Sequence, residues 1–167
     1  QALGCGTRTK YREEDLRYDR VIIMTDADVD GAHIASLLIT FFFQEMPQLI
    51  TGGHLYLGVP PLYKLAQGGK QAYARDDAHK DELLRTEFAG AKKVEISRFK
   101  GLGEMNPQQL KETTMDPRKR TLFRIDVEEG AEDTKASVES LMGNKPEARF
   151  RFIQERAEFA EAELLAV

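Results

Sequence analysis

The stretch Val21-Ile22-Ile23-Met24-Thr25-Asp26-Ala27-Asp28-Val29-Asp30-Gly31 decides the fold class of this chain. Its first five residues form a short, continuous, β-branched run, which predicts a strand buried on both faces, as in parallel sheets. Residues 32–45 follow the aspartates and are apolar nearly all round, which predicts a helix sandwiched between the sheet and a second layer. Residues 54–59 predict a second strand, stopped by Pro60-Pro61. Strand, helix and strand in this order predict one right-handed crossover.

The remaining elements fit an α/β fold. A hairpin is expected from residues 62–65 and 71–74, followed by a helix over 77–86 and a short strand over 94–97. Asn106 is a good N-cap and Pro107 suits the first helical position, so a helix is expected to about residue 115. Charged helical sequence runs from residue 145 to the end.

Composition bounds the class of protein. The 167 residues are 41% hydrophobic, enough for one core or a core with an appended lobe. A single cysteine, Cys5, excludes an internal disulfide framework and makes the cytoplasm the expected compartment. The longest apolar run, residues 34–43, is about half of what a membrane span needs, so no membrane is expected.

Charge is distributed unevenly along the chain. The net charge of −4 argues against indiscriminate nucleic-acid binding, so any DNA site must be a local patch. Residues 91–124 hold nine Lys or Arg against four Asp or Glu, a net charge of +5, whereas residues 126–133 hold five acids and no base. The basic segment is therefore the candidate patch.

The three aspartates form a candidate metal site. Asp26, Asp28 and Asp30 alternate, so an extended chain would place them on one side, with neighbours roughly 6 to 7 Å apart. Three anions that close need a cation or a proton. They follow the carboxyl end of a buried strand, where open α/β sheets bind ligands, and a hard ion such as Mg²⁺ suits their oxygens.

The cluster has other interpretations. An EF-hand loop would close with a bidentate Glu at its twelfth position, which here is Leu37, so the EF-hand is rejected. A helix cap is the ordinary role of such an Asp, and Asp30, just before the expected helix, is the best candidate for it. A sugar-nucleotide transferase, a phosphatase or another Mg²⁺-dependent phosphotransferase stays open, because Asp-x-Asp alone is a weak motif.

Four segments in order carry a family resemblance that covers nearly the whole chain. The stretch Met24-Thr25-Asp26-Ala27-Asp28-Val29-Asp30-Gly31-Ala32-His33-Ile34 closely resembles the acidic motif of the Toprim domain in bacterial type IIA topoisomerase B subunits, the gyrase and topoisomerase IV group. Further matches are Gly53-His54-Leu55-Tyr56, Pro60-Pro61-Leu62-Tyr63-Lys64, and Arg98-Phe99-Lys100-Gly101-Leu102-Gly103-Glu104-Met105-Asn106-Pro107. The resemblance implies a partial Toprim, Rossmann-like parallel sheet with flanking helices over residues 1–105 and a mostly helical carboxyl-terminal tail over 106–167.

The resemblance also implies a chemistry. Toprim domains of this family hold Mg²⁺ for breaking and rejoining double-stranded DNA, so metal roles are expected for Asp26, Asp28 and Asp30, of which Asp26 and Asp28 match the family's aspartates. The nucleophilic Tyr belongs to the A subunit of an A2B2 heterotetramer, so no catalytic residue is expected in this chain. The family's Glu comes from an upstream E-G-D-S motif, which is absent, and we expect the chain to begin after it.

DNA-contacting roles are expected for His33, Lys100 and Arg151. His33 follows the acids, Lys100 precedes glycines that allow close backbone approach, and Arg151 interrupts an acidic region. Each has an ordinary alternative: a satisfied local histidine, a solvated turn lysine, and an arginine on a solvated helix face.

The parent activity is expected to be ATP-dependent. No G-x-x-x-x-G-K-[ST] occurs, so ATP is expected to bind a domain outside this chain. The short tail after Glu147, which ends with residues 160–167, slightly favours topoisomerase IV, with chromosome decatenation and relaxation, over gyrase, with supercoiling. A further hypothesis is a docking module for the A subunit without an occupied metal site. The expected location is the cytoplasm, associated with the nucleoid.

Overall fold

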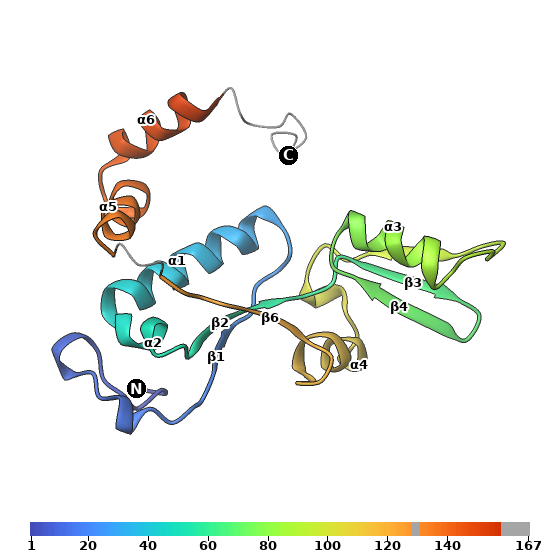
Figure 1. Cartoon of the computed structure of the whole chain (residues 1–167), viewed down its shortest axis with the longest axis horizontal. Coiled ribbons are helices and arrows are strands. Elements are labelled where there is room, and N and C mark those ends of the chain that lie inside the picture. Colours follow the sequence, from blue (N-terminus) through green and yellow to red (C-terminus); the bar gives the residue numbers. More distant parts are fainter. Residues whose placement is uncertain (128–130, 158–167) are drawn as a thin grey trace. The chain divides into compact units, whose positions relative to one another are not determined.

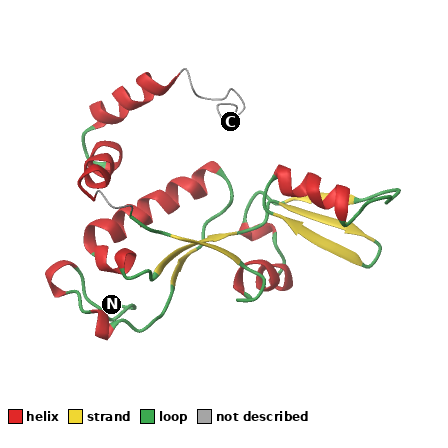
Figure 2. Ribbon diagram, viewed as in Figure 1, coloured by secondary structure: helices red, strands yellow, loops and turns green. Residues whose placement is uncertain are grey.

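The computed structural model describes residues 1–127 and 131–157, which divide into two compact units, Gln1–Ile125 and Asp126–Val167. Each unit is described by itself. The first unit holds two three-stranded sheets, coloured yellow in Figure 2. It begins with two short 3-10 helices, η1 (Arg8–Lys10) and η2 (Glu13–Asp15).

The first sheet is built around a parallel pair of strands, as the sequence predicts. Strand β1 (Val21–Ile23) pairs in parallel with β2 (Leu55–Val59), with Val21 opposite Leu55. Between them run helix α1 (Val29–Glu45), along one face of the sheet in Figure 1, and the short helix α2 (Pro47–Thr51). Ile23 and Leu55, both buried, join Leu49 and Ile50 of α2 in the hydrophobic core.

A third strand in this sheet was not predicted. Strand β6 (Thr121–Arg124) pairs antiparallel with β2, with Phe123 opposite Leu57. Its four residues are mostly exposed and lie in a basic segment, so local pattern gives little sign of a strand. Segment 106–125 thus belongs to the first compact unit, and the domain boundary expected after residue 105 stays a prediction.

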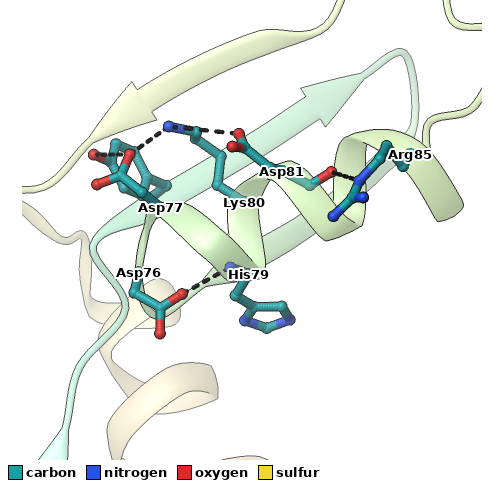
Figure 3. A network of polar contacts seen from close by, with 7 residues as sticks. Asp76, Asp77, His79, Lys80, Asp81 and Arg85 are labelled. Carbon is teal, nitrogen blue, oxygen red and sulfur yellow. Dashed lines mark hydrogen bonds and ion pairs between the residues drawn. The ribbon is translucent and has the colours of Figure 1, made fainter.

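The second sheet carries the predicted hairpin. Strands β3 (Tyr63–Gln67) and β4 (Lys70–Ala74) are antiparallel, and β5 (Glu95–Arg98) pairs with the other side of β3. Helix α3 (Asp77–Thr86) has the predicted bounds and starts with the polar network of Figure 3. A small core holds this part together, made of Tyr63, Leu65, Ala74, Leu83 and Phe88.

The predicted helix over 106–115 forms in two parts. Helix α4 (Pro107–Leu110) begins at a capping box in which the Asn106 side chain accepts from the Gln109 N–H and the Gln109 side chain accepts from the Asn106 N–H. It continues as a π-helical turn, η4 (Lys111–Met115), with Thr113 and Thr114 buried. The 3-10 turn η3 (Leu102–Glu104) precedes it.

One expectation about α1 is not met within the first unit. Its apolar residues predicted a helix covered on both sides, yet Ile34, Leu37 and Phe41 keep about half of their surface exposed. Only Gly31 and Ala35 of this helix are buried. Within residues 1–125 taken by themselves, the sheet covers one side of α1 and no second layer covers the other, because periodicity reports a face that favours burial and not what buries it.

The second unit is helical where it is described, as expected. It contains α5 (Ala131–Met142) and α6 (Pro146–Arg156), the latter with Pro146 in its first turn. Residues 158–167, the end of the tail that favours topoisomerase IV by sequence, lie outside the described residues. None of the helices within the described ranges has the length and apolar character to cross a membrane.

Candidate metal and DNA site

The acidic turn joins β1 to α1. Asp26, Asp28 and Asp30 are all exposed. Asp28 is the N-cap of α1, and its Oδ1 accepts from the Gly31 N–H at 2.7 Å. Asp30 already lies in the first helical turn. The sequence favoured Asp30 as the cap, and this expectation is wrong, because the helix starts three residues earlier than its apolar pattern.

Gly31 lets the turn close tightly on Asp26. A Cβ built on Gly31 would lie 2.1 Å from the Asp26 carbonyl oxygen, much closer than any real contact. Gly31 lies inside a helix, so glycine is needed at this position because it has no side chain and not because of its backbone conformation. It fixes the backbone of Asp26 against the first turn of α1.

The Asp26 side chain meets a segment far along the chain. The Leu102 N–H donates to Asp26 Oδ1 at 2.7 Å, and a Cβ on Gly101 would lie 2.8 Å from that same oxygen. Nearby, the Lys100 N–H donates to Glu104 Oε2 at 2.8 Å. The predicted acidic motif and the start of the predicted basic loop thus form one site, although 76 residues separate the bonded pair.

The acidic turn has no counter-charge of its own. Within residues 1–127 and 131–157, no Lys, Arg or His nitrogen forms an ion pair with Asp26, Asp28 or Asp30. Nor do those residues contain a group of three or more His, Cys, Asp or Glu side chains placed to hold a metal ion by themselves. The three aspartates therefore do not converge as a complete cage.

The donor set nevertheless fits Mg²⁺. Asp26 and Asp28 each use Oδ1 for a backbone N–H, which leaves Oδ2 of each carboxylate for another partner. Mg²⁺ is usually held by one or two carboxylates, with waters and substrate phosphate oxygens completing its shell. Asp26 and Asp28 are the pair that could supply this, whereas Asp30 belongs to the first turn of α1.

A shallow groove of about 270 Å³ runs beside these carboxylates. Asp26, Asp28 and Ala32 line it on one side and Gly58 and Val59 of β2 on another. Among the described residues, the basic side chain that lines it is Arg75, which directly follows β4. Sequence reasoning missed Arg75 because nothing local marks it as close to the acidic turn.

Comparison with known proteins agrees with this geometry. Residues 3–58 match the Toprim domain family, and residues 91–154 match the family described as DNA gyrase B subunit, carboxyl terminus. The B subunit of DNA topoisomerase 4 from Bartonella bacilliformis is 72% identical over 160 residues, 95% of this chain and 23% of the relative. The corresponding protein of Caulobacter vibrioides is 70% identical, over 98% of this chain and 23% of the relative.

The chain carries the Toprim and carboxyl-terminal regions of a type IIA topoisomerase B subunit. The B subunit of DNA gyrase from Clostridium acetobutylicum is also similar, at 45% identity over 93% of this chain and 24% of that protein. The chain therefore spans about a quarter of the length of these curated relatives.

The Toprim and carboxyl-terminal matches divide the candidate residues between them. Asp26, Asp28, Asp30 and His33 lie in the Toprim match, and Lys100 and Arg151 lie in the carboxyl-terminal match. His33 is exposed on α1, and exposed Lys100 directly precedes the loop that holds Asp26. Arg151 is exposed on α6 in the second unit, which is described separately. The structure thus brings the loop that follows Lys100 to the acidic turn.

Proposed function

We propose that this chain is the Mg²⁺-binding and DNA-contacting part of a type IIA topoisomerase B subunit that breaks and rejoins double-stranded DNA together with an A subunit. The observation that carries the proposal is the hydrogen bond from Leu102 to Asp26, which joins the acidic turn to a loop that starts at Lys100. A metal-binding carboxylate and a phosphate-binding cation are needed side by side for such chemistry.

The proposed roles follow from charge. Asp26 and Asp28 hold the ion, and Asp30 adds negative potential from the first turn of α1. When bound, Mg²⁺ stabilises negative charge on the scissile phosphate and on its leaving 3′ oxygen. Lys100 and His33 contact neighbouring DNA phosphates and fix the position of the strand, and Arg151 contacts DNA from the second unit. The attacking hydroxyl comes from the A subunit.

Topoisomerase IV is the favoured parent activity. The topoisomerase 4 relatives named above are 72% and 70% identical to this chain, whereas the gyrase relative is 45% identical. We therefore propose ATP-dependent decatenation and relaxation in an A2B2 heterotetramer, with ATP bound outside this chain. The proposed location is the cytoplasm, in association with the nucleoid.

One observation favours a second function. Because no three candidate ligands converge within the described residues, the chain could act as a docking module for the A subunit whose metal site is not used. This alternative predicts that the aspartates are dispensable.

The two functions separate in one experiment. The full-length B subunit carrying this sequence is mixed with its A partner, and Mg²⁺-dependent decatenation is compared between wild type and the Asp26→Asn, Asp28→Asn double variant. Asparagine keeps the size of each side chain and the capping ability at position 28. Loss of decatenation with unchanged A–B assembly supports the proposal. Full activity of the double variant would rule out the metal site and leave docking.

A further inference from the structure

We infer that the Gly101-Leu102 peptide is a positioning element for the Asp26 carboxylate, and that glycine at 101 is required for metal affinity. This inference rests on the proposed function and deepens it. It assigns a task to the first glycine of the Lys100-to-Glu104 loop that is distinct from contact with DNA.

The backbone of Gly101 lies close against the Asp26 carboxylate. A Cβ on Gly101 would lie 2.8 Å from both Cγ and Oδ1 of Asp26 and 3.1 Å from Oδ2. The Leu102 N–H then binds Oδ1 at 2.7 Å. The backbone of Gly101 is extended, with φ −164° and ψ 173°, which any residue adopts. The need for glycine at 101 therefore arises from the carboxylate and not from backbone conformation.

The backbone of Asp26 has little room to move away from Gly101. It is packed against Gly31, where a Cβ would lie 2.1 Å from the Asp26 carbonyl oxygen and 2.9 Å from its nitrogen. Asp26 is thus held by one glycine at its main chain and approached by another at its side chain. A methyl group at 101 has to displace the carboxylate or the loop.

The loop from Lys100 to Glu104 is anchored by the buried residues on either side of it. Before it, buried Phe99 donates its N–H to the Leu62 carbonyl oxygen at 2.8 Å. After it, Met105 is buried, while its N–H closes the turn internally by donating to the Leu102 carbonyl oxygen at 3.2 Å. Glu104 accepts from the Lys100 N–H across the turn. Displacing this loop would disturb core contacts, so the strain from a methyl group at 101 falls on the exposed Asp26 side chain.

The hydrogen bond from Leu102 to Asp26 bears on metal affinity. The N–H of Leu102 fixes the orientation of the carboxylate, so that Oδ1 is occupied and Oδ2 would be available to hold an ion without further ordering. Groups that orient a metal ligand in this way typically change affinity by about 10- to 100-fold. Turning Asp26 by an added methyl group should therefore weaken metal binding while the charge of the site stays the same.

Gly103 provides a matched control in the same loop. A Cβ on Gly103 meets no atom within 4 Å, and its φ is outside the left-handed region. Gly103→Ala adds the same methyl group to the same loop without touching Asp26. Any difference between the two variants reports the Asp26 contact.

The test uses the full-length B subunit with its A partner and with ATP omitted. Mn²⁺ alone, followed by electron paramagnetic resonance, reports metal affinity, and DNA cleavage is titrated with Mg²⁺. For Gly101→Ala we expect Mn²⁺ affinity to fall at least about tenfold, the Mg²⁺ needed for half-maximal cleavage to rise by a similar factor, and cleavage to recover at saturating Mg²⁺. Gly103→Ala should keep the Mn²⁺ affinity and the half-maximal Mg²⁺ concentration of wild type, whatever its effect on the maximal extent of cleavage.

Equal effects of the two alanines would overturn the inference. So would a Gly101→Ala variant that loses cleavage at every Mg²⁺ concentration with unchanged Mn²⁺ affinity. If Gly101→Ala does not fold, the Asp26→Ala, Gly101→Ala double variant decides, because removing the carboxylate removes the clash and must restore folding. Wild type that binds no Mn²⁺ would instead contradict the proposed function itself, so the two failures are distinguishable.

Discussion

Helices α1 and α3 begin in the same way and differ in how their acids are neutralised. Each follows a strand and has an aspartate as its N-cap, Asp28 for α1 and Asp76 for α3, that accepts from a backbone N–H three residues later at 2.7 Å. Each has a second aspartate in its first turn, Asp30 and Asp77. The two helix starts therefore share a local pattern of acids.

The acids of α3 are neutralised within the chain, as Figure 3 shows. Lys80 pairs with Asp77 and reaches Asp81 at 3.8 Å, while Arg75 Nε lies 3.3 Å from Asp76. The Lys80 ammonium, followed by the Tyr63 hydroxyl, holds the pKa of Asp77 below its ordinary value. The His79 N–H, with help from Arg75, lowers the pKa of Asp76 in the same way.

The acids of α1 differ because no cation of the described residues pairs with them. Asp28, and Asp26 just before it, accept from backbone N–H groups, which orient carboxylates without cancelling a full charge. The comparison teaches that an acidic turn is a good metal candidate when its own chain leaves the charge uncompensated. The acids of α3 also provide matched control positions for variants of the α1 turn.

The largest expected effect is on DNA cleavage. Asp26→Asn in the full-length subunit with its A partner should reduce Mg²⁺-dependent cleavage by at least about 100-fold, because a charge that holds the ion is removed. Asp76→Asn, which keeps the α3 cap, should leave cleavage near wild type. Linearisation of supercoiled plasmid measures both, and equal losses in the two variants would show that the comparison has no functional meaning.

A smaller effect is expected from giving α1 an internal cation. Lys80 is the fourth residue of α3, and exposed Ala32 is the fourth residue of α1 and lines the groove beside Asp26 and Asp28. Ala32→Lys should raise the Mg²⁺ needed for half-maximal cleavage by about tenfold through competition for the carboxylates.

Ser36→Lys is the control for this variant, since it adds the same charge one helical turn further along α1. It should change the Mg²⁺ requirement much less. If both lysines act alike, the effect is a general one of helix charge and not of the groove.

The third prediction concerns the increase in the free energy of unfolding that bound Mg²⁺ causes. Mg²⁺ at ten times its Kd should raise the free energy of unfolding by about 1.4 kcal/mol in wild type, because the ion binds only the folded state. Asp76→Asn should show the same gain and Asp26→Asn little of it. Urea unfolding with and without Mg²⁺ tests this, and a gain that survives in Asp26→Asn would place the ion elsewhere.

The smallest effect concerns acid stability. The folded-state pKa values of Asp76 and Asp77 are lowered from 3.8, so their contribution is present above that value and is lost as pH falls through the lower folded pKa. The Asp76 side chain is half exposed and Asp77 is exposed, which keeps the contribution small. The Asp76→Asn, Asp77→Asn double variant should therefore lose less stability than wild type on acidification below pH 3.8. Urea midpoints across that range measure it, and parallel curves would contradict it.

Much of the framework follows from local pattern. The parallel β1–α1–β2 order, the β3–β4 hairpin and the bounds of α3 are confirmed, because burial on both strand faces, a glycine turn and helical periodicity are local signals. The ion pairs of α3 are also readable in part, since Asp77 and Lys80 are three residues apart on one helix. Strand β6 and the exposed face of α1 could not be predicted from the sequence, because each depends on which other segment lies alongside.

The sequence by itself determined the identity of the candidate residues: the aspartates that follow β1 and the basic loop that starts at Lys100. Only the tertiary structure decided that Asp28 and not Asp30 caps α1, and that Leu102 binds Asp26. Spacing along a chain predicts neighbours within one helix or strand, where geometry repeats every few residues. A contact across 76 residues depends on how the strands and loops pack, and no local period encodes it.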